Sequence, residues 1–331
     1  MKTERKVMAM NRRRLNDSLV FMICGALVLC ALVAGIIANL PEKSTPPVEI
    51  SVVVPDSGSA RWSNFKSGLR AAAREYSIDL NIVKTDAFSG SQQEKDVIEQ
   101  EISQGAKGII TQLITSTDAE AFIQQTAKEV PVVLCDSIVS VDQDNVSVLS
   151  MNNEAAGNSL GIQASRMHKD TSFTVGVLAG QSNATRTAQR LTGLMNALNE
   201  NGGTISWLLY SDTTTVEKLQ SLLGTSPVDV MVALDNTALE TAIDYCMLDQ
   251  ADAPALYGIG TSDKCIYYTD VGLIDKLIVQ DEYAMGYQAV EQLARRLQKH
   301  TAMQSGTIDF KVITKDNMFT DQNQKLLFPM K

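Results

Sequence analysis

Polar residues follow or end short apolar runs at several places along the chain. Each run predicts a buried β-strand, because Val, Ile and Leu succeed one another without the alternation of a half-exposed strand. These polar residues are Ser59, Asp136, Ser137, Asp235, Asn236, Thr261 and Gln280. In open parallel sheets, ligands bind beyond the carboxyl ends of the strands. Neutral hydrogen-bonding groups with single carboxylates suit a polyhydroxylated or amide-bearing small molecule there.

The carboxylates and amides at these strand ends each have two competing roles. Asp136 can accept hydrogen bonds from two ligand hydroxyls, or it can cap a turn. Asp235 and Asn236 share one strand end, and we expect one to bind ligand while the other caps a helix that begins at Thr237.

Trp62 and Arg190 lie where helices follow strands. The ring of Trp62 can stack on the apolar face of a sugar, or it can pack at the surface or between lobes. The guanidinium of Arg190 can donate to two ligand oxygens at once, with an exposed salt bridge as the alternative. Arg186, one helical turn earlier, is a weaker candidate, and Trp207 is expected in a strand of the core.

The sequence offers little for catalysis, and we expect no enzyme, no cofactor and no metal site. The two histidines, His168 and His300, lie near predicted helix ends and far from the strand ends, so a nucleophile–histidine pair is hard to build. The segment 180–184 lacks the second glycine of a nucleophile elbow, and 258–263 lacks the third glycine of a dinucleotide motif.

Cysteine spacing also argues against zinc. Three cysteines lie in the body of the chain, with no Cys-x-x-Cys spacing. Cys246 and Cys265 are the pair that a disulfide would join, and buried thiols are the alternative.

Charge separates a basic N-terminus from an acidic body. The chain of 331 residues has a net charge of −9, with 44% hydrophobic and 20% charged residues, as in an ordinary globular protein. Beyond residue 48 there are 22 basic and 35 acidic residues, a net charge of −13. Such a body repels nucleic acid, which requires clustered Lys and Arg.

Residues 19–38 form an uncharged apolar run of 20 residues, enough to span about 30 Å as a helix. Six Lys and Arg residues precede it, which predicts a cytoplasmic segment 1–18, a membrane signal anchor 19–40, a linker 41–48 and an extracytoplasmic body. The expected localisation is therefore the cell membrane, single-pass. A cleaved signal, which would leave a secreted or periplasmic protein, and a lipid anchor are the alternatives.

From residue 49 onward, apolar strands alternate with amphipathic helical patterns. About eleven strands are expected, too many for one typical sheet, so the sequence predicts an α/β fold with two doubly wound parallel-sheet lobes. The last elements expected are a strand 277–279, a helix 281–299, a single closing strand 307–313 and a C-terminal tail 321–331.

Several motifs, in order, carry a family resemblance over nearly all of residues 49–315. They are the first strand with Trp62 and the helix containing Gly68, Pro131–Asp136, Met151–Asn153, Arg190–Gly193, Ala233–Asn236, Leu277–Gln280 and Gly286. The chain resembles type 1 periplasmic binding proteins of the ribose/galactose kind, which share their fold with the effector domains of LacI-type repressors. The resemblance implies an N-lobe of 49–151 and 282–310, a C-lobe of 152–281 and 311–320, and three hinge crossings near Asn152, Asp281 and Lys311.

The resemblance also implies roles for individual residues. It favours ring stacking for Trp62, ligand contacts for Arg190, Asp136 and Gln280, and a hinge position for Asn153, which binds ligand or satisfies backbone. Ser137 stands where such sugar binders often have Arg, and Gly260 stands where many have Asp. We therefore expect ribose and galactose to bind weakly and a modified, larger or less polar sugar-like molecule to be the ligand.

The partner implied by the resemblance is an ABC permease that receives the sugar-like solute. The alternative is a membrane histidine kinase or chemoreceptor to which the liganded domain is presented. A LacI-type transcription regulator is disfavoured, because residues 1–48 hold an apolar segment in place of a DNA-binding motif.

Overall fold

The computed structural model describes residues 48–141, 144–168, 171–180, 185–210, 215–248 and 253–328, with residues 22, 25, 26, 29 and 30. The chain divides into two units, Met1–Pro47 and Val48–Lys331. No helix among the described residues is long and apolar enough to cross a membrane. The apolar segment 19–38 lies almost wholly outside the described residues.

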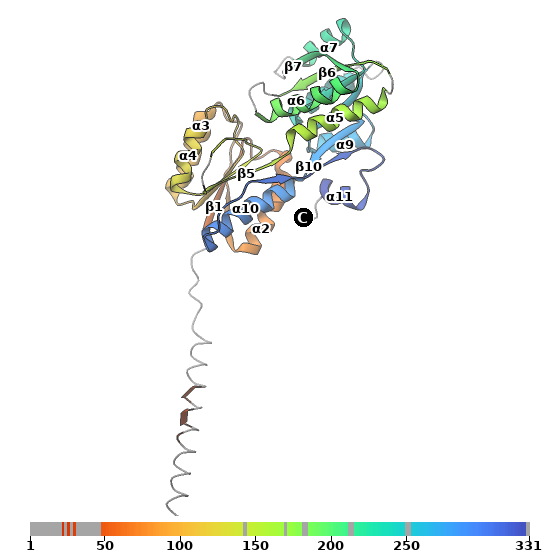
Figure 1. The fold of residues 1–331 in the computed structure, drawn as a ribbon. Coiled ribbons are helices and arrows are strands. Elements are labelled where there is room, and N and C mark those ends of the chain that lie inside the picture. Colours follow the sequence, from red (N-terminus) through yellow and green to blue (C-terminus); the bar gives the residue numbers. More distant parts are fainter. Residues whose placement is uncertain are drawn as a thin grey trace, which may run out of the picture. The chain divides into compact units, whose positions relative to one another are not determined.

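The second unit contains two six-stranded sheets, one in each lobe (Figure 1). All strands of the N-lobe sheet are parallel. In spatial order they are β11 (Gly306–Ile308), β5 (Val146–Met151), β4 (Val132–Cys135), β3 (Gly108–Thr111), β1 (Val48–Val53) and β2 (Ile78–Ile82).

The C-lobe sheet is parallel except at one edge, where β12 runs antiparallel to β10. In spatial order its strands are β12 (Phe310–Ile313), β10 (Lys276–Gln280), β9 (Ala255–Ile259), β8 (Val230–Ala233), β6 (Phe173–Ala179) and β7 (Gly203–Tyr210).

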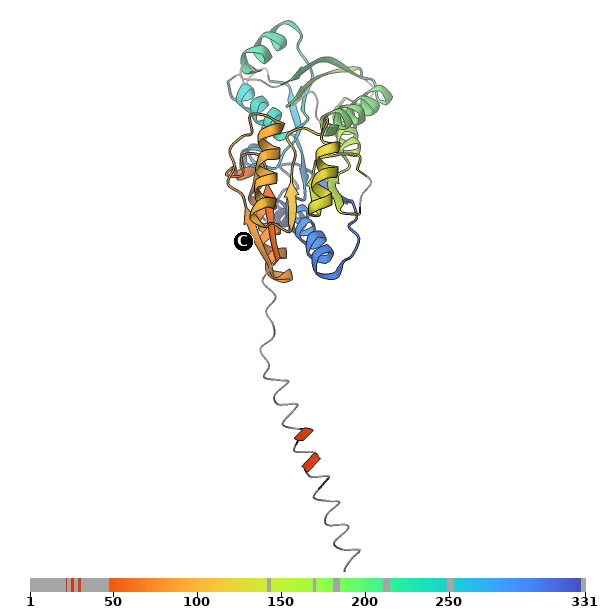
Figure 2. The same ribbon diagram turned by 90° about the vertical axis from the view of Figure 1, so that its left-hand side faces the viewer.

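Helices cover both faces of each sheet, which explains the continuous apolar strands of the sequence. In β1, for example, Val52 packs into the core beneath α2 and α10, whereas Val53 packs into the core beneath α3 and α4. Figure 2 shows α3 and α4 side by side on one face of the N-lobe. The N-lobe helices are η1 (Ala60–Trp62), α2 (Ser63–Tyr76), α3 (Ser91–Gln104), α4 (Glu120–Glu129) and α10 (Glu282–Lys299).

The C-lobe follows the same plan with its own helices. They are α5 (Asn153–Met167), α6 (Thr185–Glu200), α7 (Thr215–Thr225), α8 (Asn236–Leu248), α9 (Asp263–Asp270) and α11 (Asp321–Leu327). Two doubly wound lobes are therefore confirmed.

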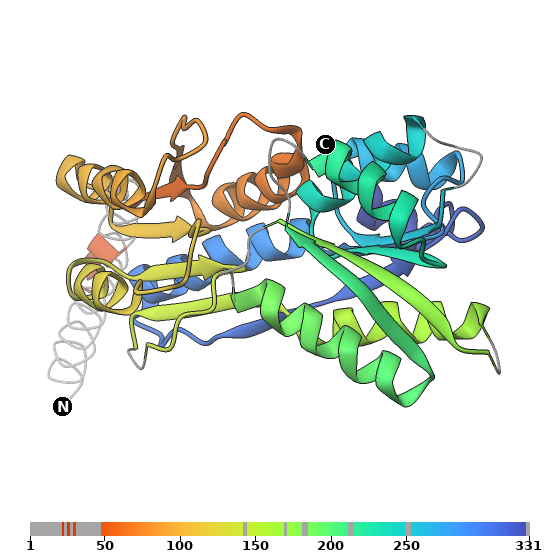
Figure 3. The same cartoon turned by 90° about the horizontal axis from the view of Figure 1, so that it is seen from above.

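The chain crosses between the lobes at Asn152, Asp281 and Asp309. Asn152 and Asp281 are also helix N-caps, because their side chains accept hydrogen bonds from Ala155 N and Ala284 N at 2.9 and 2.8 Å. The backbone N–H of Asp281 donates to Asp309 O at 3.0 Å, which ties two crossings together. Figure 3 shows the segment with β11 and β12 running from one lobe to the other.

The later elements differ from the sequence predictions in three places. The expected closing strand 307–313 is two strands that break at Asp309 and join different sheets, so the third crossing lies at Asp309, two residues from Lys311. Periodicity within one apolar run cannot reveal such a change of partner sheet. The segment between β9 and β10, for which no element was expected, carries α9, and part of the expected tail 321–331 is α11.

Pairs of glycines let two helices approach closely in each lobe. In the N-lobe, a Cβ on Gly68 would lie 2.0 Å from Tyr283 O, and one on Gly286 would lie 2.2 Å from Phe65 O. In the C-lobe, a Cβ on Gly157 would lie 1.8 Å from Arg190 O. The close α5–α6 packing therefore fixes the backbone of the helix that carries Arg190.

The body cysteines Cys135, Cys246 and Cys265 are free and buried. Burial is the main cause that raises the pKa of Cys246 to about 11 and that of Cys265 to about 12. These thiols therefore behave as small core residues, the alternative to a disulfide.

Candidate ligand-binding cleft

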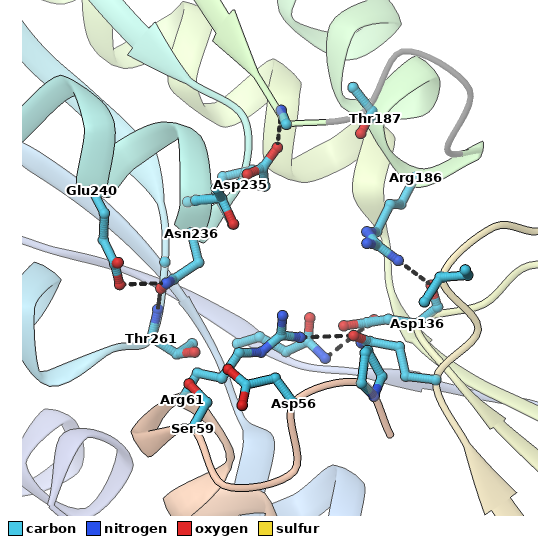
Figure 4. Close-up of a pocket in the computed structure, with 18 of the residues that line it drawn as sticks. Asp56, Ser59, Arg61, Asp136, Arg186, Thr187, Asp235, Asn236, Glu240 and Thr261 are labelled. Atoms are coloured by element: carbon cyan, nitrogen blue, oxygen red, sulfur yellow. Dashed lines mark hydrogen bonds between the residues drawn. The ribbon is translucent and has the colours of Figure 1, made fainter. Parts of the chain in front are cut away.

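A cavity of about 490 Å³ lies between the two lobes, at the carboxyl ends of their strands. Its N-lobe wall includes Asp56, Ser59, Arg61, Gln112, Asp136 and Glu282. Its C-lobe wall includes Arg186, Thr187, Arg190, Asp235, Asn236, Glu240, Gly260, Thr261 and Gln280. Figure 4 shows labelled side chains of both lobes converging on this space. The volume and polarity suit a small polar molecule.

Asp136 directly follows β4 and lies at the wall of the cavity. Its backbone has a φ of 50°, a left-handed conformation that Asp tolerates better than most residues. Its Oδ1 accepts a hydrogen bond from Gln280 Nε2 at 3.3 Å, so a residue of the other lobe's sheet holds the carboxylate in place. The remaining acceptor sites of Asp136 are available to ligand hydroxyls.

Arg190 is buried and held by two hydrogen bonds within the C-lobe. Its Nε donates to Asn153 Oδ1 and its Nη1 donates to Leu234 O, each at 2.7 Å. Burial lowers the pKa of Arg190 to about 10, so the guanidinium stays charged at neutral pH. The group is thus fixed in orientation and lines the cavity, and its Nη2 makes no hydrogen bond to any residue that the structure describes.

Of Asp235 and Asn236, it is Asp235 that caps the helix; ligand binding by the other stays a prediction. Asp235 Oδ1 accepts from Ala238 N at 2.9 Å, which caps α8, and its other oxygen accepts from Gly180 N. Asn236 Oδ1 accepts from Thr261 N at 3.0 Å and so fixes the loop after β9. Both side chains and Thr261 line the cavity, although most of their polar atoms already have protein partners.

Trp62 does not face the cavity, which corrects the expectation of ring stacking. Its side chain is 1% exposed, and its Nε1 donates to Pro55 O at 3.0 Å. The guanidinium of Arg61 lies 4.1 Å from the centre of the ring and lines the cavity in its place. The first turn of η1 therefore presents the cation to the cavity and turns the aromatic ring toward Phe65 in the core.

Two other expected contacts also lie outside the cavity lining. Ser137 is fully buried, donates to Cys135 O and accepts from Leu113 N at 2.7 Å, so it holds the β3 and β4 loops together. Asn153 donates to Met151 O and accepts from Arg190, so it satisfies the backbone and positions the arginine. Ser59 lines the cavity as expected.

Five polar residues of the cavity wall were not among the candidates from the sequence. Gln112 Oε1 accepts a hydrogen bond from Arg61 Nη2 at 2.7 Å. Glu282 begins α10, where an acidic residue is ordinary, so nothing in the sequence distinguished it. Thr187 lies in the first turn of α6, and Glu240 lies on α8. Arg61 was overlooked beside the more conspicuous Trp62.

Gly260 lies in a tightly packed part of the cavity wall. A Cβ there would lie 2.9 Å from Cys265 Sγ and 3.1 Å from Asn236 Oδ1. The glycine therefore fits a close approach of the loop to α8 and α9, and it adds no space at the floor of the cavity.

Among the residues that the structure describes, no cluster of three or more His, Cys, Asp and Glu side chains could hold a metal ion. The cavity wall presents arginines, carboxylates, amides and hydroxyls, which can bind a solute without any covalent step.

Comparisons with known proteins agree with this geometry. Residues 50–301 match the family described as periplasmic binding protein domain. A carbohydrate transporter solute-binding protein from Agrobacterium radiobacter, solved with D-arabinose, is 20% identical, with a TM-score of 0.78, covering 86% of this chain and 100% of that one. No curated protein matches the chain.

Two further solved structures share the fold. GanP, a glucose-galactose binding protein from Geobacillus stearothermophilus, is 22% identical, with a TM-score of 0.74 and coverage of 83% and 100% of the two chains. The Caulobacter myo-inositol binding protein is 16% identical, with a TM-score of 0.75 and coverage of 87% and 99%. The family consists of solute-binding proteins and not enzymes, and this chain belongs to it, as a type 1 periplasmic binding protein.

Proposed function

We propose that this protein captures a small polyhydroxylated, sugar-like solute in the cavity between its lobes. The observation that carries the proposal is the convergence of hydrogen-bonding groups from both lobes on one cavity of about 490 Å³. Asp136 supplies an acceptor from the N-lobe, and Arg190 supplies a fixed donor from the C-lobe. The similar proteins solved with D-arabinose and myo-inositol support a polyol as the ligand class.

Delivery to an ABC transporter is the role we infer for the bound solute. The similar Agrobacterium protein is described as a carbohydrate transporter solute-binding protein, which supports this role. The alternative, presentation of the solute to a sensor kinase or chemoreceptor, stays a prediction. Anchoring in the cell membrane through residues 19–38, with the body outside, is likewise proposed from the basic flank and the apolar run.

Lobe closure would follow from the same geometry. In the described part of the chain, the backbone crosses between the lobes at Asn152, Asp281 and Asp309, and a solute that contacts both walls favours the state in which the walls are close.

A thermal-shift screen of the full-length chain tests the proposed function. We expect at least one neutral or charged monosaccharide or cyclitol to raise the melting temperature, because a ligand that binds only the folded state stabilises it by about 2.7 kcal/mol at a hundredfold excess over its Kd. The Asp136→Ala variant should lose this shift, whereas Asp244→Ala, an exposed change on α8, should keep it. No shift with any compound would contradict the proposal.

A further inference from the structure

Three arginines face the cavity, and none of them forms a salt bridge with a carboxylate in the described part of the chain. Arg61 belongs to the N-lobe, whereas Arg186 and Arg190 belong to α6 of the C-lobe. Their hydrogen bonds are to neutral acceptors: Gln112 Oε1 for Arg61, Asp136 O for Arg186 at 3.4 Å, and Asn153 Oδ1 and Leu234 O for Arg190.

A guanidinium group has five N–H donors, and most donors of Arg61 and Arg186 make no hydrogen bond to the residues that the structure describes. Arg61 is stacked on Trp62, which keeps its plane in place at the cavity wall. Arg190 is fixed by its two short hydrogen bonds. The arrangement is therefore a set of oriented donors, and oriented guanidinium groups bind carboxylate and phosphate oxygens with high geometric specificity.

Positively charged arginine side chains from the two lobes line this cavity. Burial is the largest cause that lowers the pKa of Arg61, and the positive charge of Arg186 from the opposite lobe lowers it further. The same charge of Arg186 adds to the burial that lowers the pKa of Arg190. The charges of Glu282, Asp136 and Asp235 act in the opposite direction and raise the pKa of both arginines.

Five carboxyl groups line the same wall, those of Asp56, Asp136, Asp235, Glu240 and Glu282, and most of them already accept hydrogen bonds within the protein. Both oxygens of Asp235 accept from backbone N–H groups, and Glu240 Oε1 accepts from Asn236 Nδ2. Asp136 accepts from Gln280. Asp56 lies exposed at the rim.

Glu282 is the remaining carboxyl group, and it lies where it can act as a donor. Its Oε2 is buried and has no hydrogen-bond partner. Burial, followed by the charge of Asp136, raises the pKa of Glu282 well above its ordinary value, against the opposing effects of Arg61 and Arg190. A carboxyl group held in its neutral form can donate its O–H to an anionic oxygen.

We propose that the natural solute carries an anionic group, a carboxylate or a phosphate on a sugar-like frame, which Arg61, Arg186 and Arg190 bind between the lobes. This inference rests on the proposed function and narrows its ligand class. Ser137 stands where similar sugar binders often have an arginine, and in this protein Arg61 and Arg186 supply positive charge at the cavity wall.

Calorimetry on the full-length chain with matched ligands tests the inference. For glucose and for galactose, the titrants are the neutral sugar, its uronate, its 6-phosphate and its 2-amino derivative. For arabinose and for ribose, the titrants are the neutral sugar, its aldonate and its 5-phosphate. We expect the tightest ligand to be anionic and to bind at least about tenfold more tightly than the neutral sugar of the same frame, because hydrogen bonds to charged groups are about twice as strong as neutral ones. The uronate, aldonate and phosphate arms identify the anion.

Two variants locate the effect. Arg61→Gln and Arg186→Gln should each reduce the preference for the anionic ligand over the neutral one by about tenfold. Arg70→Gln, the same change at an exposed position of α2 outside the cavity lining, should leave that preference unchanged.

Three other results would overturn the inference, and each has a different meaning for the proposed function. A neutral or amino sugar that binds as tightly as its anionic counterpart contradicts the anionic ligand but keeps the proposed function. A preference that survives in both cavity variants places the anion elsewhere. No binding by any titrant contradicts both the inference and the proposed function.

Discussion

Arg190→Ala is expected to abolish measurable binding of the solute that the screen identifies. Truncating a buried charged group that contacts a ligand costs about 2–5 kcal/mol, or roughly 30-fold to several thousandfold in affinity. The side chain is only 5% exposed, and its Nη2 makes no hydrogen bond within the described part of the chain. Calorimetry of the wild type and the variant measures the loss.

The same substitution is also expected to lower stability. Asn153 Oδ1 and Leu234 O would both lose their donor, and a buried unpaired polar group costs about 1–3 kcal/mol. Urea unfolding checks this. Because partial unfolding could mimic lost binding, Arg190→Lys serves as a second variant: it keeps the charge but loses the planar fork, and it should bind weakly while folding. Wild-type affinity in both variants would contradict the role of Arg190.

Gly157→Ala is expected to destabilise the protein by about 3 kcal/mol. The new Cβ would lie 1.8 Å from the backbone oxygen of Arg190, and a backbone atom cannot rotate away as a side chain can. Helices α5 and α6 must separate, which loosens the C-lobe core around Leu160 and Leu194. Urea unfolding monitored by circular dichroism gives the change.

Gly224→Ala is the matched control for this effect. Gly224 lies exposed on α7, and a Cβ there would have no neighbour within 4 Å. Alanine favours helix over glycine by about 1 kcal/mol, so this variant should be slightly more stable than the wild type. Equal stability of Gly157→Ala and the wild type would show that the close α5–α6 packing does not matter.

Much of the fold could be predicted from local patterns, because the strands are buried on both faces and the helices between them are amphipathic. Helix α10, for example, begins at Glu282, one residue after the predicted start, and ends where expected, at Lys299. The break at Asp309 could not be predicted, since the residues on both sides favour strands and only tertiary pairing assigns them to different sheets.

The site could be predicted in part for a related physical reason. Strand ends place Asp136, Asp235 and Gln280 at the cavity whatever their rotamers, so sequence position was enough. Which of the neighbours Arg61 and Trp62 faces the cavity depends on the turn of a short 3-10 helix. That turn, and the burial of Ser137 and Asn153, are set by packing that the sequence does not display.

The central claim is that one solute binds between the lobes and contacts both of them. Its most direct test is a crystal structure of the protein with the compound that stabilises it most in the thermal-shift screen. We expect the compound to occupy the cavity, with its oxygen atoms within hydrogen-bonding distance of Asp136 in the N-lobe and Arg190 in the C-lobe. A compound bound elsewhere, such as in the groove beside Tyr283 and Phe328, with the cavity holding only water, would contradict the claim.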